Sequence, residues 1–197
     1  MPDRDTDESL LERARAGEED AFVSLYTRHR DALYRFACRL LASEAAAEDV
    51  THDCFLSLFK NPERFDAARG THLRTYLFAA AHNLAMKHFR RTGRETWIDE
   101  TADEPSAPDA EQPLSRLLDA ELSAAVRAAV ESLPALQREV LVLYEFEDLS
   151  LAEIATVVAA EVNTVKSRLA RARANLRRTL APYIERREAL VAGSVER

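Results

Sequence analysis

Residues 149–176 read LSLAEIATVVAAEVNTVKSRLARARANL. Ser150, followed three residues later by Glu153, forms a capping box, which predicts that a helix begins there. Asn163 is a good N-cap for a second helix, because its side chain can accept a hydrogen bond from a free backbone N–H group. A short helix, a short turn and a longer helix predict a helix-turn-helix. Ala159 stands in the turn, where many helix-turn-helix motifs have Gly.

The second of these helices has two different faces. One is an apolar band, made of Val165, Leu169, Ala172, Leu176 and Leu180. The opposite face collects Asn163, Lys166, Ser167, Ala170, Arg171, Ala174 and Arg178. Small Ala side chains permit close approach, while Lys and Arg reach phosphates and guanine edges. This face is typical of a helix that lies in the major groove of DNA. The alternative is a solvated amphipathic helix packed in a bundle.

The composition favours an all-helical protein. Only 4 of the 197 residues are Gly, while Ala, Leu, Arg and Glu are abundant. The 2 Cys residues provide neither a disulfide framework nor a paired-Cys metal site, which fits a reducing cytoplasm. The opening MPDRDTDESL is too polar for a secretory signal, and no apolar run approaches the roughly 20 residues that cross a bilayer. We expect a cytoplasmic, all-α protein without direct membrane insertion.

Charge is distributed unevenly along the chain, whose formal net charge is -7. Residues 61–94 have 7 basic and 2 acidic side chains, and residues 150–181 have 6 and 2. Residues 95–121 have 1 basic and 9 acidic side chains, and the stretch 98–113 contains three Pro. Such a segment is a poor core former. We therefore predict a domain over 1–94, a flexible acidic linker over 95–115 and a second domain over 116–197.

The first basic island, GTHLRTYLFAAAHNLAMKHFRRTGR (70–94), interleaves aromatic rings with cations. This mixture suits unpaired bases, which stack on rings while the backbone is held electrostatically. Asn83 could hydrogen-bond a base edge. The alternative is that the aromatic residues, Tyr76 above all, belong to the core. Arg90, Arg91 and Arg94 would also be favoured at a helix C-terminus by the helix dipole alone.

A third feature, SEAAAEDVTHDCFLSLFK (43–60), has an acidic face on an otherwise apolar helix. Glu48, Asp49 and Asp53 could dock on a basic protein surface, or form an ordinary solvated face. His52, Cys54, His82 and His88 lack the spacing of a zinc site. We expect Cys38 and Cys54 to be buried structural residues, and we expect no catalytic residue, metal or cofactor.

Three segments in this order resemble a known family. They are EDVTHDCFLSLF (48–59), RTYLFAAAHNLAMKHFRR (74–91) and SLPALQREVLVLYEFEDLSLAEIATVVAAEVNTVKSRLARARANL (132–176). Over roughly residues 18–181 the chain resembles a bacterial RNA polymerase sigma factor of the small two-domain, extracytoplasmic-function class. The resemblance implies that the first domain binds the polymerase core and the minus-10 promoter element, and that the second reads the minus-35 element.

The resemblance also assigns roles to individual positions. The positions implied to contact a coiled coil of the largest core subunit are Asp49, Val50, His52, Asp53 and Phe55. Those implied for the minus-10 element are Tyr76, Asn83, Lys87, Arg90 and Arg91, with Asn83 capturing a flipped base. Those implied for the minus-35 element are Asn163, Thr164, Lys166, Ser167, Arg168, Ala170 and Arg171. Family members usually have Gln in place of His52 and Trp in place of Tyr76, and often have Gly in place of Asn163.

The implied partners are the large subunits of core RNA polymerase, promoter DNA and an anti-sigma factor, which could be membrane-bound. The acidic linker resembles the segment that threads toward the polymerase active site. The resemblance describes a binding protein and not an enzyme. Two other hypotheses are a helix-turn-helix regulator that acts without the polymerase core, and a helical metal or thiol enzyme.

Overall fold

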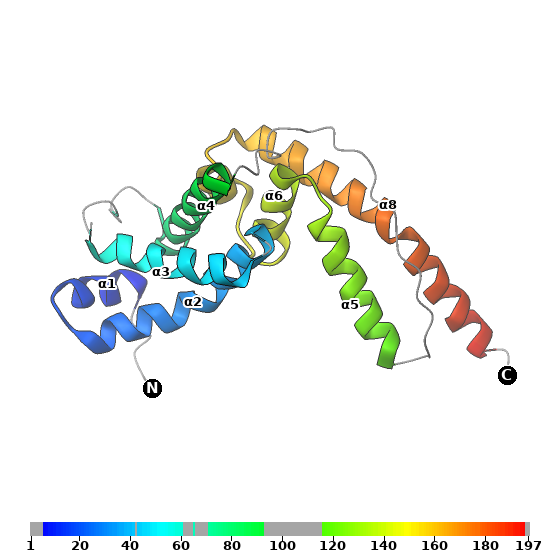
Figure 1. Cartoon of the computed structure of the whole chain (residues 1–197), viewed down its shortest axis with the longest axis horizontal. Coiled ribbons are helices and arrows are strands. Elements are labelled where there is room, and N and C mark those ends of the chain that lie inside the picture. Colours follow the sequence, from blue (N-terminus) through cyan, green and yellow to red (C-terminus); the bar gives the residue numbers. More distant parts are fainter. Residues whose placement is uncertain (1–5, 42, 61–64, 66–70, 93–115, 196–197) are drawn as a thin grey trace.

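The computed structural model describes residues 6–41, 43–60, 65, 71–92 and 116–195. Over these ranges the chain forms helices and no strand, as Figure 1 shows, which confirms the predicted all-α class. The first half consists of α1 (Asp7–Arg15), α2 (Glu19–Leu41), α3 (Glu44–Lys60) and α4 (Leu73–Thr92). The second half consists of α5 (Arg116–Glu131), α6 (Ala135–Glu145), α7 (Leu151–Val157) and α8 (Val162–Val195). The predicted linker 95–115 lies outside the described residues.

In the first half, α2, α3 and α4 pack together through apolar stripes. Buried on these helices are Leu25, Leu33, Phe36, Leu40, Val50, Cys54, Leu58, Leu73, Leu77, Phe78, Ala81 and Ala85. The rings of Phe36 and Phe78 meet edge to face with 5.3 Å between centroids. Helix α3 runs from Glu44 to Lys60, and Asn61-Pro62 follow it in the sequence. The core of this half therefore fixes the orientation of α4.

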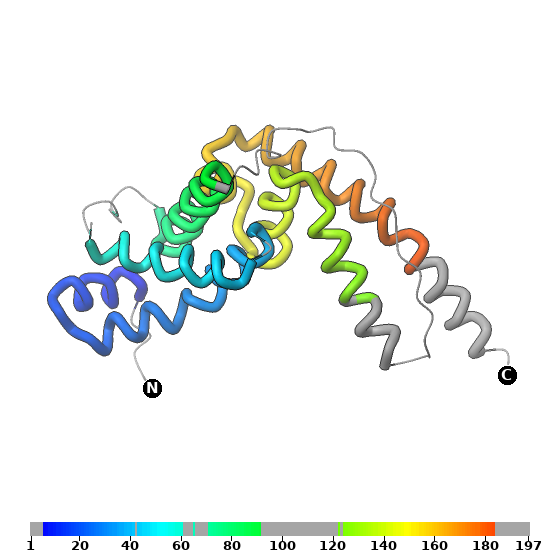
Figure 2. The backbone as a smooth tube through the Cα atoms, in the orientation of Figure 1, coloured from blue at the N-terminus to red at the C-terminus, as the bar shows by residue number. Residues whose placement is uncertain are grey.

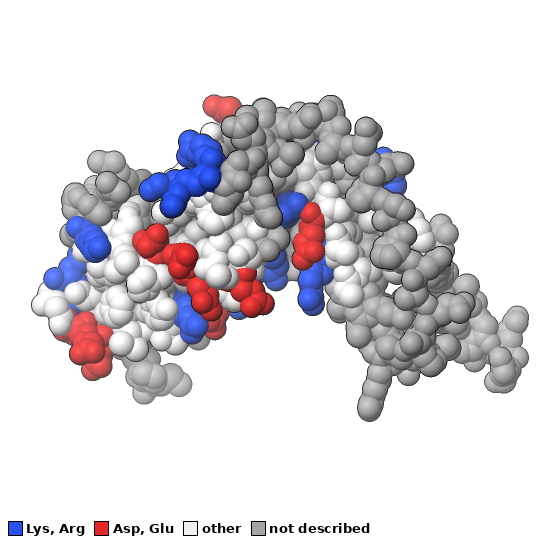
Figure 3. All heavy atoms as spheres, in the orientation of Figure 1, with Lys and Arg blue, Asp and Glu red and all other residues white. Residues whose placement is uncertain are grey.

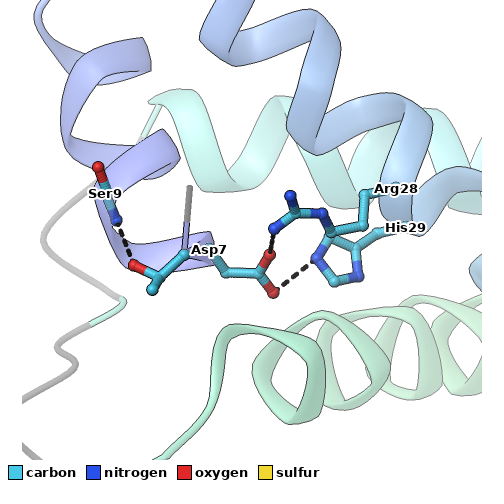
Figure 4. A network of polar contacts seen from close by, with 5 residues as sticks. Asp7, Ser9, Arg28 and His29 are labelled. Carbon is cyan, nitrogen blue, oxygen red and sulfur yellow. Dashed lines mark hydrogen bonds and ion pairs between the residues drawn. The ribbon is translucent and has the colours of Figure 1, made fainter. Parts of the chain in front are cut away.

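Helix α1 is not among the elements that the sequence led us to expect. The Thr6 hydroxyl caps it by accepting a hydrogen bond from the backbone N–H of Ser9. Asp7 binds Arg28 and, at 2.8 Å, the Nε2 atom of His29 on α2 (Figure 4). Burial alone would raise the pKa of Asp7, but the hydrogen bonds from His29 and Arg28 prevail and lower it. This carboxylate thus fastens α1 to α2.

The second half contains the predicted helix-turn-helix, formed by α7 and α8. The capping box is confirmed: the Ser150 hydroxyl accepts from the Glu153 N–H at 3.3 Å, and the Glu153 carboxylate accepts from the Ser150 N–H at 2.9 Å. Ala159 turns the chain with φ at 50°, in the left-handed region that glycine adopts more readily. The turn residue therefore carries the strain that Gly avoids in many such motifs.

The predicted N-cap of α8 was wrong. Helix α8 begins at Val162, so Asn163 already lies in its first turn. The Val165 N–H donates to the Glu161 carbonyl at 3.1 Å, which places the start of the helical hydrogen bonds at Glu161. The Asn163 carbonyl instead accepts from the Ser167 hydroxyl at 2.9 Å. The Asn163 side chain is consequently exposed on the first turn.

The two halves pack against each other. Helix α4 contacts α7, and α2 contacts α6, which in turn packs on α8. Figure 2 shows the short helices of the second half lying beside the first half, while α5 and α8 extend away from it. One cluster of buried apolar side chains includes residues of both halves, from Leu10 to Ala172. The relative position of α4 and α8 is therefore set by direct contacts.

Candidate nucleic-acid interface

The first three turns of α8 present one exposed polar face. Val165, Leu169 and Ala172 are buried beneath it. Exposed on the outer side are Asn163, Thr164, Lys166, Ser167, Ala170 and Arg171. This division follows the helical period that the sequence predicts. A cation, a hydroxyl and small side chains stand together on this face, as direct readout of a major groove requires.

Arg168 is not on this face, and its implied contact with the minus-35 element stays a prediction. Its side chain is 16% exposed, and Nη1 lies 3.5 Å from Oε1 of Glu139 on α6. Position 168 stands three residues after the buried Val165, so it borders the apolar band and not the exposed face. Because Glu139 is almost fully buried, its carboxylate needs a cation nearby. Arg168 forms an ion pair with that carboxylate in this structure.

Helix α4 presents a second basic surface. Asn83, Lys87, Arg90 and Arg91 are exposed along it. Figure 3 shows basic side chains gathered beside one end of α4. Tyr76 is half-buried, and its ring meets the buried ring of Phe65 with 5.4 Å between centroids. Tyr76 therefore belongs partly to the core, the alternative that the sequence left open.

Helix α3 exposes the acidic face. Asp49, His52 and Asp53 are exposed, together with Glu48. Figure 3 shows a row of acidic side chains over this helix. Val50 and Phe55 are buried at 6% and 3% exposure, so their side chains offer no surface to a partner in this structure. The α3 stripe faces the core at both positions, and the exposed face carries Leu56, which is 37% exposed, beside Asp49, His52 and Asp53.

The titratable residues considered for a metal or thiol site do not converge in the described part of the chain. In the described part of the chain, no three His, Cys, Asp or Glu side chains could together hold a metal ion. His82 faces Glu139, with 3.0 Å between Nε2 and Oε2. Cys54 is buried, and burial raises the pKa of its thiol to about 12. Cys38, predicted to be buried, is half-buried. No helix of the described residues is both long and apolar enough to span a bilayer.

Sequence reasoning missed the polar residues that join the two halves. Arg39 and Arg74 of the first half both face Glu147, which follows α6. Thr75 bonds Glu153, and His82 bonds Glu139. A signal was present for Glu139, because it stands directly before the buried run Val140–Leu143. A carboxylate in that position implies a charged partner, although the partner's identity depends on the tertiary packing.

Comparison with known proteins gives matches over both halves. The Sigma-70 region 2 family matches residues 25–95, and the Sigma-70 region 4 family matches residues 123–176. The RNA polymerase sigma-H factor of Pseudomonas aeruginosa is 30% identical, over 93% of this chain and 98% of its own. The ECF RNA polymerase sigma factor SigW of Bacillus subtilis is 28% identical, over 86% of this chain and 94% of its own.

Two solved structures are similar over most of the chain. CnrH, in complex with the cytosolic domain of CnrY, is 28% identical with a TM-score of 0.64, and the match covers 89% of this chain and 97% of that chain. The sigma factor RpoE of Bartonella quintana, in complex with the anti-sigma factor NepR, is 28% identical with a TM-score of 0.62. That match covers 81% of this chain and 96% of the other.

Proposed function

The chain belongs to the extracytoplasmic-function class of bacterial RNA polymerase sigma factors, and we propose that it binds promoters with two helices, α8 on the minus-35 element and α4 on the minus-10 element. A sigma factor directs RNA polymerase to promoters by binding and not by catalysis. The observation that carries the proposal is that both helices keep exposed cations beside an exposed amide or hydroxyl, on faces that point away from the core.

On the minus-35 side, α8 reads duplex DNA. Lys166 and Arg171 supply long cations for phosphates or guanine edges. Asn163 and Ser167 add hydrogen-bonding groups on the same face, and Ala170 lets the helix approach closely. Arg168 contributes indirectly, by neutralising Glu139 beneath that face.

On the minus-10 side, α4 captures an unpaired strand. Extruding a base costs a few kcal/mol, and a pocket or stacking contact must offset that cost. The exposed Asn83 amide can bond a base edge, while Lys87, Arg90 and Arg91 hold the backbone. Tyr76 offers the exposed part of its ring as a stacking surface.

The acidic face of α3 is the proposed contact for the polymerase core. Asp49, His52 and Asp53 stand exposed on it, so a basic surface of a large core subunit is the complementary partner. Two of the similar solved structures contain an anti-sigma factor or the cytosolic domain of a partner, and an anti-sigma factor is accordingly a proposed partner here. The proposed site of action is the cytoplasm, where the polymerase works.

Run-off transcription tests the function directly. Purified bacterial core polymerase is incubated with a promoter library, with and without the chain, and the transcripts are sequenced. We expect a set of start sites that appears only with the chain, preceded by common motifs near minus-10 and minus-35. Core alone is the control. The absence of any chain-dependent start site would contradict the proposal. Tight binding of DNA by the free chain without initiation would favour a regulator that acts without the core.

A further inference from the structure

Arg15, the last residue of α1, bonds the backbone of Phe65. Its Nη2 atom donates to the Phe65 carbonyl at 3.3 Å, between residues that are 50 positions apart in the sequence. Phe65 stands between α3 and α4 in the sequence, and its side chain is buried at 5% exposure. The hydrogen bond is itself partly buried, so water competes with it less than at an open surface. Helix α1 is thus linked to a residue of the connection between α3 and α4.

Phe65 in turn contacts Tyr76 on the first turn of α4. The two ring centroids lie 5.4 Å apart and the ring planes meet at 62°, in the edge-to-face arrangement that aromatic pairs prefer. Tyr76 is half-buried, so part of its ring stays exposed. A long side chain on a helix has two common χ1 rotamers, and a neighbouring ring that packs against one of them favours it. Phe65 therefore sets the direction in which the exposed part of the Tyr76 ring points.

Helix α1 holds Arg15 in place because it is fixed near both ends. Near its start, Asp7 lies 2.8 Å from the Nε2 atom of His29 on α2 (Figure 4). Just beyond its end, Gly17 has φ at 96° and donates its N–H to the Ala14 carbonyl at 3.1 Å. That bond is one of the two that define a Schellman motif, which ends a helix at a set residue. The guanidinium of Arg15 consequently starts from a rigid position.

A stacking surface works best when it is ordered before the base arrives. Ordering a side chain at the moment of binding costs free energy, which is then lost from the interaction. If only a fraction of the molecules have the ring in the productive orientation, the apparent affinity falls by that fraction. The neighbours that orient Tyr76 thus contribute to strand capture without touching the strand.

We propose that Arg15 is a positioning residue for capture of the minus-10 strand: through Phe65, it holds the Tyr76 ring in the orientation that stacks on an unpaired base. The inference rests on the proposed role of Tyr76. It gives α1, a helix with no proposed DNA contact, a part in promoter opening.

Nuclear magnetic resonance of the free chain tests the positioning without DNA or polymerase. With ¹³C-labelled tyrosine, the ring signals of Tyr76 are assigned from their absence in Tyr76→Phe. Arg15→Met keeps an apolar stem and removes the donor, so we expect the Tyr76 signals to move. Arg15→Lys restores a donor, and we expect it to reverse most of that movement. Arg13→Met is the matched control on α1, because Arg13 bonds Glu18 at 2.8 Å, and we expect no movement for it.

Promoter opening by the holoenzyme tests the consequence, with 2-aminopurine in the minus-10 element as the probe. Arg15→Met should slow opening about threefold, as expected if the productive orientation falls to roughly a third of the molecules. Binding of a minus-35 duplex that lacks the minus-10 element should be unchanged. Tyr76→Ala should slow opening about tenfold, because it removes the stacking ring itself. In the Tyr76→Ala background, Arg15→Met should add no further slowing, since both act through the same ring.

A second variant covers the case in which Arg15→Met disturbs α1 as a whole. Phe65→Leu removes the ring contact with Tyr76 and keeps the backbone carbonyl that Arg15 bonds. We expect it to move the Tyr76 signals and to slow opening as Arg15→Met does. Far-UV circular dichroism and thermal unfolding check that every variant is folded.

Three results would each overturn the proposal: Tyr76 signals that stay in place in folded Arg15→Met, equal changes in Arg13→Met, and a slowing by Arg15→Met that persists in the Tyr76→Ala background. Run-off transcription with the wild type separates this inference from the proposed function. Start sites that depend on the chain, together with unmoved Tyr76 signals, would contradict the positioning alone. Moved signals without any such start site would support the positioning of the ring and contradict the proposed function.

Discussion

Helices α4 and α8 are both rich in basic residues, and on each helix some cations are exposed while others pair with a carboxylate. On α8, Lys166 is exposed on the proposed DNA face, while Arg168 and Arg173 are held by Glu139 and Glu145 of α6. On α4, the cations of the last turns are exposed, while Arg74 in the first turn is held by Glu147. In both helices the outcome depends on whether a carboxylate of a neighbouring helix lies within reach.

The comparison shows that a count of basic residues overstates a DNA-binding surface. A cation that neutralises a buried carboxylate is part of the fold, and its loss changes stability more than DNA affinity. A cation on an exposed face contributes mainly to the phosphate and base contacts. The two classes can be separated by measuring stability and DNA binding on the same variants.

The largest change in stability is expected for a cation that pairs with a buried carboxylate. Arg168→Ala leaves the Glu139 carboxylate with His82 alone, and we expect it to lower the free energy of unfolding by about 2 kcal/mol. Urea unfolding followed by circular dichroism measures the loss. The folded variant should retain wild-type affinity for minus-35 duplex in the holoenzyme. A loss of DNA affinity without a loss of stability would show that Arg168 contacts DNA and does not serve mainly to stabilise the fold.

The opposite pattern is expected for Lys166→Ala. Removing this exposed cation should weaken binding of minus-35 duplex by the holoenzyme roughly tenfold, which corresponds to about 1.4 kcal/mol, with stability unchanged. Arg173→Ala is the matched control on the same helix, because its guanidinium is already bonded to Glu145 at 2.6 Å. We expect less than a twofold change for it. Equal losses in the two variants would contradict the distinction.

On α4 the same logic applies to strand capture. Asn83→Ala should slow promoter opening by about five- to tenfold, because a captured base loses a polar contact worth about 1 kcal/mol. A template with a pre-melted bubble at minus-10 should restore most of the rate if the defect lies in melting. A defect of the same size on both templates would show that Asn83 does not act in DNA melting. Fluorescence of 2-aminopurine in the minus-10 element follows the opening.

The carboxylate that fastens α1 offers a pH test. The pKa of Asp7 is lowered in the folded state, so its stabilisation is present above the unfolded pKa of about 3.9 and is lost as the pH falls through the folded pKa. We expect Asp7→Asn to lower the free energy of unfolding by about 1 kcal/mol at pH 7. The difference from wild type should shrink below about pH 4. A difference that is constant from pH 7 to pH 3 would show that the charge is not responsible.

The smallest effect is expected in the turn of the helix-turn-helix. Ala159 has φ at 50°, which costs about 1–2 kcal/mol for a residue with a Cβ atom. Gly removes this strain but loses about 0.5–1 kcal/mol of chain entropy on folding. Ala159→Gly should therefore raise the free energy of unfolding by about 0.5 kcal/mol. Thermal unfolding measures it, and a clear destabilisation would mean that the Ala159 methyl group makes a contact worth more than the strain.

Much of the fold was readable because helical information is local. The apolar face predicted for residues 43–60 and the capping box at Ser150 each depend on residues that are close together in the sequence, and the structure confirms both. The start of α8 was misplaced by two residues, because Glu161 and Asn163 can both stand before the same stripe. Helix α1 was missed although the Thr6 cap is a local signal for it, whereas its bond from Asp7 to His29 on α2 exists only in the tertiary structure.

The sequence by itself determined the all-helical class, the helix-turn-helix and the resemblance to sigma factors, because periodicity, caps and motif order are properties of short segments. Only the tertiary structure decided which cations are exposed and which are held. His82 and Glu139 are 57 residues apart in the chain and meet only because the two halves pack together. A buried carboxylate pairs with whichever cation the tertiary packing places beside it, and no single segment of the sequence determines that placement.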